Sequence, residues 1–123
     1  MWAIIAAVVI KLFLIDFMIA DGNSMEPTIK NGAMLVINRL QYGLRFPGQR
    51  GYLIRWGSPR PREVVVFYTP EGQLAVKRCM ELTQEGFFAQ GDNRLQSYDS
   101  RSYGPVPIDN TFGKVLGITL GGK

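Results

Sequence analysis

The strongest constraint on the fold is a segment that predicts a β-hairpin. Residues 63–68, EVVVFY, are β-branched or aromatic apart from the first, which favours a strand. Residues 69–72, TPEG, predict a turn, and residues 73–80, QLAVKRCM, predict the strand that returns from it. With this hairpin as its clearest element, the chain is predicted to be mainly β.

The remainder of the chain predicts short strands joined by turns. Fourteen glycines and seven prolines are spread along 123 residues, a composition that favours turns over long helices. This length suits one domain rather than two. A long irregular segment is predicted at 39–62. Further strands are predicted at 13–20, 33–38, 86–89 and 112–120.

Residues 1–15 are predicted to form a short membrane anchor, and residues 16–123 a single β-rich domain. The run MWAIIAAVVI is apolar without interruption, and LFLI follows Lys11. As a helix this segment would extend about 22 Å, less than the roughly 30 Å of a hydrocarbon core. The anchor is therefore short or truncated, and a buried N-terminal helix or strand is the alternative. A cleaved secretory signal is not expected, because no basic residues precede the run and no A-x-A site follows it.

The chain contains no histidine and one cysteine, Cys79. These absences exclude a Ser-His-Asp triad, a Cys-His pair and a His-ligated metal site within the chain. They also exclude an internal disulfide and a thiolate zinc cluster. No metal or cofactor is expected, and a hydrolase of this sequence would need a carboxylate or a lysine as its general base.

The net charge is +4, and the basic residues are unevenly placed. Residues 27–62 include seven Lys and Arg but no Asp or Glu, which favours an anionic partner, either lipid headgroups or nucleic acid. An exposed loop without a partner is the alternative. The side chains expected at headgroup depth are Tyr42, Phe46, Tyr52 and Trp56, with Arg45, Arg50 and Arg55 at the lipid phosphates.

Ser24 is the candidate nucleophile. It lies in GNSMEPT, between Gly22, which permits close approach of a peptide backbone, and Pro27, which stiffens the chain. A nucleophilic hydroxyl needs such a firmly held position near backbone N–H groups. Alone, this segment fits an ordinary turn or a helix N-cap equally well.

Lys77 is the candidate general base. Strand alternation directs it to the same face as Ala75 and Cys79, which are small and apolar. Burial there lowers the pKa of the amine, because desolvation disfavours the charged form, and a neutral amine can accept the serine proton. The alternative is an edge-strand lysine that extends into water.

Residues 91–106, GDNRLQSYDSRSYGPV, predict a structural network of polar side chains. Ser97 is predicted to orient the lysine amine by a hydrogen bond. An ordinary charged surface turn is the alternative. The ion pairs predicted in this segment are Asp99 with Arg101, or Asp92 with Arg94.

These segments in this order resemble the bacterial type I signal peptidases. The matching motifs are SMEPT, VVVF, KR and GDNR-x-x-S-x-DSR-x-x-G-x-V, supplemented by YGLRF and by Lys11 and Phe13. The resemblance runs from about residue 11 to residue 115. It implies a signal peptidase or LexA-like catalytic core of antiparallel strands that acts as a serine endopeptidase.

The resemblance also implies roles for single residues. Ser24 takes the position of the nucleophile and Lys77 that of the general base. An oxyanion hole that includes the backbone N–H of Ser24 is implied, and Gly22 stands where other members add a hydroxyl. The supporting positions are Ser97, which orients the lysine, and the salt bridge of Asp99 with Arg101.

The implied substrate is the signal peptide of an exported preprotein, cut after small residues at positions −3 and −1. Two shallow apolar pockets are then expected, with the substrate added as a strand beside residues 18–21 and 75–77. The implied location is the bacterial cytoplasmic membrane, with the catalytic domain on the extracytoplasmic face. A membrane lipid surface is an expected partner and nucleic acid is not. The residues expected to line the pockets are Ala20, Met25, Ile29, Leu35 and Val76.

Besides its short N-terminal anchor, the sequence departs from the family in two places. Arg62 and Glu63 precede VVVF where Gly-Asp is common, and only residues 79–90 separate the lysine strand from the last motif. Members often insert a β cap at the second place, so the second domain is reduced or absent.

Three rival hypotheses remain at this stage. A self-cleaving repressor of the LexA kind would need an N-terminal DNA-binding domain, for which the chain has no room. A conjugative-transfer processing peptidase would share the serine and lysine. A basic, β-rich nucleic-acid-binding module would explain residues 39–62, but it would leave SMEPT and GDNR without a role.

Overall fold

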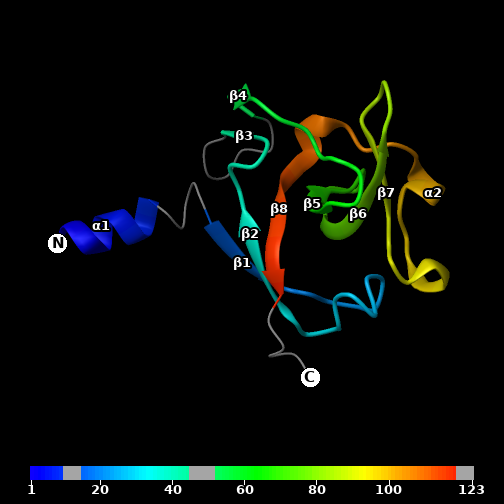
Figure 1. Ribbon diagram of the computed structural model, residues 1–123, viewed down its shortest axis with the longest axis horizontal. Helices are drawn as coiled ribbons and strands as arrows, with labels where there is room; N and C mark the ends of the chain where they lie inside the picture. The colour runs from blue at the N-terminus through cyan, green and yellow to red at the C-terminus, as the bar shows by residue number, and fades with distance from the viewer. Residues whose placement is uncertain (10–14, 45–51, 119–123) are drawn as a thin grey trace.

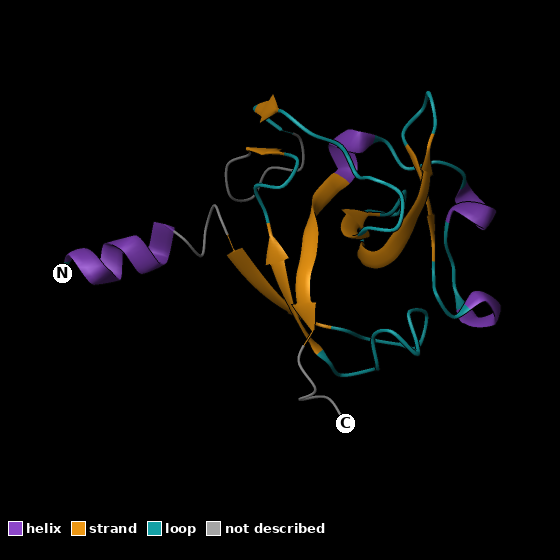
Figure 2. Ribbon diagram, viewed as in Figure 1, coloured by secondary structure: helices purple, strands orange, loops and turns teal. Residues whose placement is uncertain are grey.

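The fold is a curled antiparallel sheet with a helix at the N-terminus (Figures 1 and 2). The computed structural model describes residues 1–9, 15–44 and 52–118. Six strands form the main sheet in the order β1-β2-β8-β5-β6-β7, and every neighbouring pair is antiparallel. These strands are β1 (Ile15–Ile19), β2 (Met34–Asn38), β5 (Val64–Tyr68), β6 (Leu74–Leu82), β7 (Phe87–Gln90) and β8 (Thr111–Ile118).

Short elements complete the described chain. A two-stranded ribbon forms a second, small sheet within the segment predicted to be irregular. The predicted mainly β class is confirmed. The remaining elements are β3 (Gly43–Leu44), β4 (Ile54–Arg55), η2 (Arg94–Gln96), α2 (Ser100–Tyr103) and η3 (Ile108–Asn110).

The predicted hairpin is the pair β5 and β6, in register from Val64 opposite Arg78 to Tyr68 opposite Leu74. Strands β2, β7 and β8 occur where short apolar runs predicted them, and β1 occupies the described part of residues 13–20.

Strand β5 is buried on both faces, which explains why its sequence is a continuous apolar run rather than an alternating one. Val66 packs into a first core, and Val65 and Phe67 pack into a second. The first core consists of Met25, Ile29, Ala33, Leu35, Ile37, Val66 and Phe112. The second consists of Tyr42, Val65, Phe67, Cys79, Phe87, Ala89 and Val106. The central hairpin therefore separates two apolar layers.

The N-terminal helix α1 (Trp2–Val9) is apolar throughout. Within residues 1–9, 15–44 and 52–118, no helix has both the length and the apolar character needed to span a bilayer. The predicted anchor at residues 1–15 stays a prediction. Lys11 and Phe13 lie outside the described residues.

Two aromatic side chains expected at headgroup depth lie elsewhere, so that part of the prediction is wrong. Tyr42 is 0% exposed in the second core, where its hydroxyl donates to Glu63. The hydroxyl of Tyr52 donates to the carbonyl of Thr111. In both cases a buried hydroxyl finds an acceptor inside the protein. Trp56 is exposed, as expected. The residues Arg45, Phe46 and Arg50 lie outside the described part of the chain.

Arg62 has a left-handed backbone, with φ of 80°. Its N–H donates to the carbonyl of Cys79 at 2.7 Å, and its own carbonyl accepts from the Arg78 side chain at 2.8 Å. These hydrogen bonds hold the entry to β5 in a conformation that suits glycine.

We expect Arg62→Gly to raise the free energy of unfolding by about 0.5 kcal/mol, because relief of left-handed strain outweighs the added freedom of the unfolded chain. Arg60→Gly is the matched control at a nearby exposed arginine without positive φ, and it should lower stability by a similar amount. Urea unfolding measures both. A larger loss for Arg62→Gly than for Arg60→Gly would contradict the strain argument.

Candidate active site

The side chains of Ser24 and Lys77 meet although 53 positions separate them in the sequence. Lys77 Nζ lies 2.6 Å from Ser24 Oγ, within hydrogen-bond distance. The lysine is 6% exposed, and burial lowers the pKa of its amine, while the negative charge of Asp99 partly opposes this shift. The arrangement pairs a hydroxyl with an amine that is biased toward its neutral form.

Two asparagines hold the loop that carries Ser24. The backbone N–H of Gly22, whose φ is +100°, donates to the Asn31 side chain at 2.9 Å. The carbonyl of Ser24 accepts from the N–H of Asn93 at 2.8 Å, and the Asn93 side chain donates to the carbonyl of Asn23. Asn31 and Asn93 were missed by the sequence analysis, because a single asparagine in a turn carries no distinguishing pattern.

The backbone N–H of Gly22 is thus already used, so Gly22 supports the loop rather than offering a donor to a ligand. In the described residues, no acceptor is recorded for the backbone N–H of Ser24. A Cβ at Gly22 would meet no atom within 4 Å, so the space beside it is open.

Asp99 is the centre of the predicted polar network. It is 0% exposed and accepts hydrogen bonds from the backbone of Gly91 (2.8 Å), the Ser97 hydroxyl (2.7 Å) and the Arg101 guanidinium (3.0 Å). Burial alone would raise the pKa of Asp99, but these hydrogen bonds outweigh it and lower the pKa to about 2. The structure therefore contains the ion pair predicted between Asp99 and Arg101.

The hydrogen bond predicted from Ser97 to Lys77 is not found among the described residues. The Ser97 hydroxyl donates its proton to Asp99, because an ionised carboxylate is a strong hydrogen-bond acceptor. Gly91 explains the close packing here, since a Cβ at this position would clash with Ser97 and with the carbonyl of Ser24.

The predicted pair of Asp92 with Arg94 is wrong, because Asp92 is bound by Arg78 of β6. Arg78 donates two hydrogen bonds to the carboxylate, at 2.9 Å and 2.7 Å, and the Thr28 hydroxyl donates a third. The bidentate geometry raises the pKa of Arg78 and lowers that of Asp92. These hydrogen bonds connect the loop of Ser24 to the strand of Lys77. In the sequence, the only indication of them was that Arg78 directly follows Lys77.

A cleft of about 180 Å³ lies beside the two side chains, between the end of β1 and the start of β6. Four of the five expected pocket residues line it, and the fifth, Leu35, does not. Leu35 is 0% exposed within the first core, because its alternation in β2 directs it inward behind the cleft. The four that line the cleft are Ala20, Met25, Ile29 and Val76.

Among the described residues, both walls of this cleft carry a strand edge that has no paired neighbour on the side of the cleft. The N–H and carbonyl of Ala20 pair with Ala33 and Gly32 toward β2, so the backbone groups of Ile19 and Asp21 point to the open side.

On β6, the hydrogen bond from Thr69 N–H to Gln73 carbonyl sets the alternation, which directs the backbone of residues 75 and 77 toward β5. The backbone groups of Leu74 and Val76 therefore face the other way, and β7 pairs with β6 from Arg78 onward. Strand edges of this kind are where proteins add an extended peptide as a further strand.

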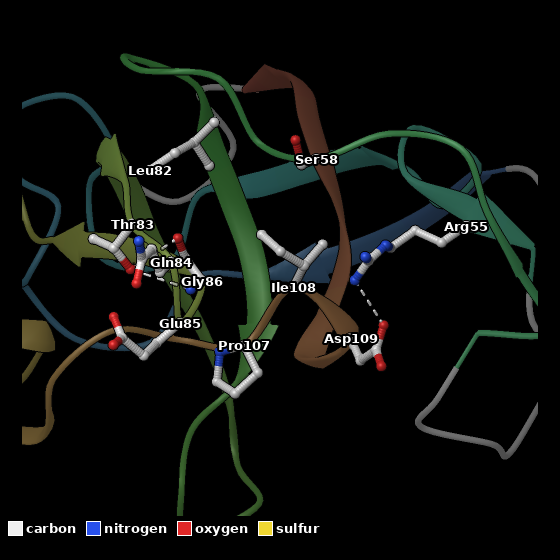
Figure 3. Close-up of a pocket in the computed structure, with 10 residues that line it drawn as sticks. All are labelled: Arg55, Ser58, Leu82, Thr83, Gln84, Glu85, Gly86, Pro107, Ile108 and Asp109. Atoms are coloured by element: carbon white, nitrogen blue, oxygen red, sulfur yellow. Dashed lines mark hydrogen bonds and ion pairs between the residues drawn. The ribbon is translucent and has the colours of Figure 1, made fainter.

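A second, more open depression of about 430 Å³ lies near the turn between β6 and β7 (Figure 3). An ion pair between Arg55 and Asp109, with N and O 3.0 Å apart, closes one side of it. Ser58 lines this depression together with the carboxylates of Glu85 and Asp109. Within the described part of the chain, however, Ser58 forms no hydrogen bond with either, and Asp109 is paired with Arg55. Among the described residues there is also no group of three or more His, Cys, Asp or Glu suited to a metal ion. The cleft of Ser24 and Lys77 is therefore the candidate active site.

Comparisons with known proteins show the family of the chain. Residues 1–83 and 75–120 match the family described as "Signal peptidase, peptidase S26". Signal peptidase I of Bacillus caldolyticus is 26% identical over an alignment of 156 positions that covers 93% of this chain and 85% of that protein.

Two other relatives are similar over shorter shares of their own length. Mitochondrial inner membrane protease subunit 1 of Xenopus tropicalis is 32% identical over 111 residues, covering 81% of this chain and 66% of that protein. Signal peptidase I of Pseudomonas fluorescens is 31% identical over 112 residues, covering 85% of this chain and 38% of that protein.

These matches define the class as a hydrolase, a serine endopeptidase. The chain belongs to the signal peptidase family, peptidase S26, and within it to the type I signal peptidases.

We expect Asp99→Asn to lower the free energy of unfolding at pH 7 by roughly 1.5 to 3 kcal/mol, because an amide replaces the charged acceptor that Gly91, Ser97 and Arg101 share. The folded-state pKa of about 2 lies below the unfolded value of about 3.9, so the stabilisation is present above pH 4 and is lost as pH falls toward 2. Unfolding followed by circular dichroism from pH 5 to pH 2 should therefore show that the free energy of unfolding falls less steeply with pH in the variant than in the wild type. An identical slope in both proteins would contradict the role of Asp99.

Proposed function

We propose that this protein removes signal peptides from exported preproteins, with Ser24 as the nucleophile and Lys77 as the general base. The observation that carries the proposal is the 2.6 Å approach of Lys77 Nζ to Ser24 Oγ in a buried setting. Family membership supports the reaction class, and the absence of histidine in the sequence leaves lysine or a carboxylate as the base.

In the proposed mechanism, Ser24 Oγ attacks the carbonyl carbon of the substrate residue at −1 while its proton passes to the neutral amine of Lys77. The oxyanion that forms is stabilised by the backbone N–H of Ser24. Lys77 then gives the proton to the departing amine of residue +1, which leaves an acyl-enzyme. Water attacks the ester, Lys77 accepts its proton, and the proton returns to Ser24 as the acid departs.

The two free strand edges support an extended substrate bound between β1 and β6. Side chains at −1 and −3 would then point toward the first core, where Ala20, Ile29 and Val76 leave shallow space. Such pockets favour small residues because larger ones do not fit. This mode runs the substrate parallel to β1, with position −1 nearest Ser24.

We also propose that the protein acts at the bacterial cytoplasmic membrane, with the catalytic domain on the extracytoplasmic face and a lipid surface beside it. The apolar helix α1 and the exposed side chains of Leu53, Ile54 and Trp56 support a membrane contact. Attachment through residues 1–15 is part of this proposal. A conjugative-transfer peptidase or a nucleic-acid-binding module is not favoured, because the matched relatives are signal peptidases and a mitochondrial inner membrane protease.

We expect Ser24→Ala and Lys77→Met each to reduce preprotein cleavage by at least about a thousandfold, because each removes a reacting group. Lys77→Arg should fail as well, since a guanidinium keeps its proton. The readout is cleavage of a purified preprotein with the cut site mapped by mass spectrometry. The controls are Ser102→Ala and Lys30→Met, both at exposed positions, which should retain activity. Near-normal cleavage by either site variant would refute the serine/lysine mechanism.

We expect kcat/KM to rise about tenfold per pH unit on the acidic side and to level off where Lys77 becomes neutral. Because burial lowers the pKa of Lys77, this plateau should begin below the 10.5 of an ordinary lysine. Rates from pH 5 to pH 10 on one peptide measure the profile. A maximum at acidic pH would indicate a carboxylate base instead.

A further inference from the structure

We propose that Asp21 makes this enzyme favour a lysine or arginine at position −2 of the substrate, between the two small residues. The inference rests on the proposed function and on the substrate strand described there. It concerns the substrate side chain at −2, which points away from the two apolar pockets.

Asp21 lies at the end of the wall that β1 contributes to the cleft, three positions before Ser24. It is exposed, and within the described residues its carboxylate forms neither an ion pair nor a hydrogen bond. By contrast, Asp92 and Asp99 are held by arginines. The carboxylate of Asp21 is therefore available to a bound peptide.

Strand alternation determines which substrate side chain meets this carboxylate. Met18 and Ala20 pack against the first core, so Ile19 and Asp21 face the opposite side; Ile19 is 57% exposed. On the other wall, Val76 packs against the first core and Ala75 against the second. The side chains of a peptide strand between these walls therefore alternate in the same way, one toward the first core and the next toward the opposite face. With −1 and −3 turned toward the first core, the side chain at −2 lies on the face of Asp21.

The charges along the cleft favour a cation at this position. Asp21 is the carboxylate among the residues that line the cleft, and Lys77 is the cation. Lys77 acts as a neutral amine in the proposed mechanism, so a net negative charge remains. The charge that acts on the Lys77 amine is that of Asp99, so a change at Asp21 alters substrate recognition rather than the base. A glutamate at −2 would meet like charge and be disfavoured.

The test uses three synthetic peptides that are identical except for Lys, Gln or Glu at −2, each with Ala at −3 and −1. For the wild-type enzyme at low salt, we expect kcat/KM for the Lys peptide to exceed that for the Glu peptide by about threefold to tenfold, because the attraction of Lys and the repulsion of Glu each contribute an effect the size of an exposed charge pair. The ratio should shrink at about 1 M salt, where screening acts within roughly 3 Å. Asp21→Asn should bring the ratio close to one, and Asp21→Lys should reverse it.

Glu85→Gln is the matched control, because Glu85 is an exposed carboxylate in the turn between β6 and β7, and it should keep the wild-type ratio. Equal cleavage of the three peptides by the wild type, or a Lys preference that survives in Asp21→Lys, would overturn this inference while the proposed function stands. If the wild type cleaves none of the three peptides after the alanine at −1, the proposed function is overturned, and this inference with it.

Discussion

A single lysine held in the interior of the protein is the constraint on which the rest of the structure depends. An isolated ammonium group is costly to bury, so the site must either pair it or keep it neutral. Here the amine meets the Ser24 hydroxyl, and the carboxylate whose charge acts on the amine, Asp99, is itself paired with Arg101. Asp99 therefore holds Gly91, Ser97 and Arg101 in place, and its charge is not left free to neutralise Lys77 fully.

The framework around that amine explains why three separate segments of the chain carry so many polar residues. The Arg78–Asp92 pair joins the strand of the base to the loop of the nucleophile through Thr28. Asp99 joins the last polar segment to Gly91. The nucleophile and the base lie on separate elements, so their spacing is only as firm as these cross-links.

Much of the fold followed from the sequence, and the reasons are local. The EVVVFY and QLAVKRCM runs predicted the central hairpin because a strand buried on both faces must be apolar throughout. Ser24 and Lys77 were identified by motif order, and the structure brings them together. The partners of Ser97 and Asp92 and the burial of Leu35 away from the cleft were not predicted correctly, since they depend on which segments meet in three dimensions. Alternation along one strand does not reveal what lies across from it.

The two unpaired edges beside the cleft carry a consequence for which proteins the enzyme attacks. A sheet edge binds a partner through its main chain, and a segment already folded into a helix or a sheet has no main-chain groups to spare. Under the proposed function, a target must therefore unwind locally before it fits between β1 and β6. The main-chain groups of folded proteins nearby are already hydrogen-bonded, which protects these proteins from cleavage. The enzyme therefore selects extended segments first, and the side chains at −1 and −3 matter only within such segments.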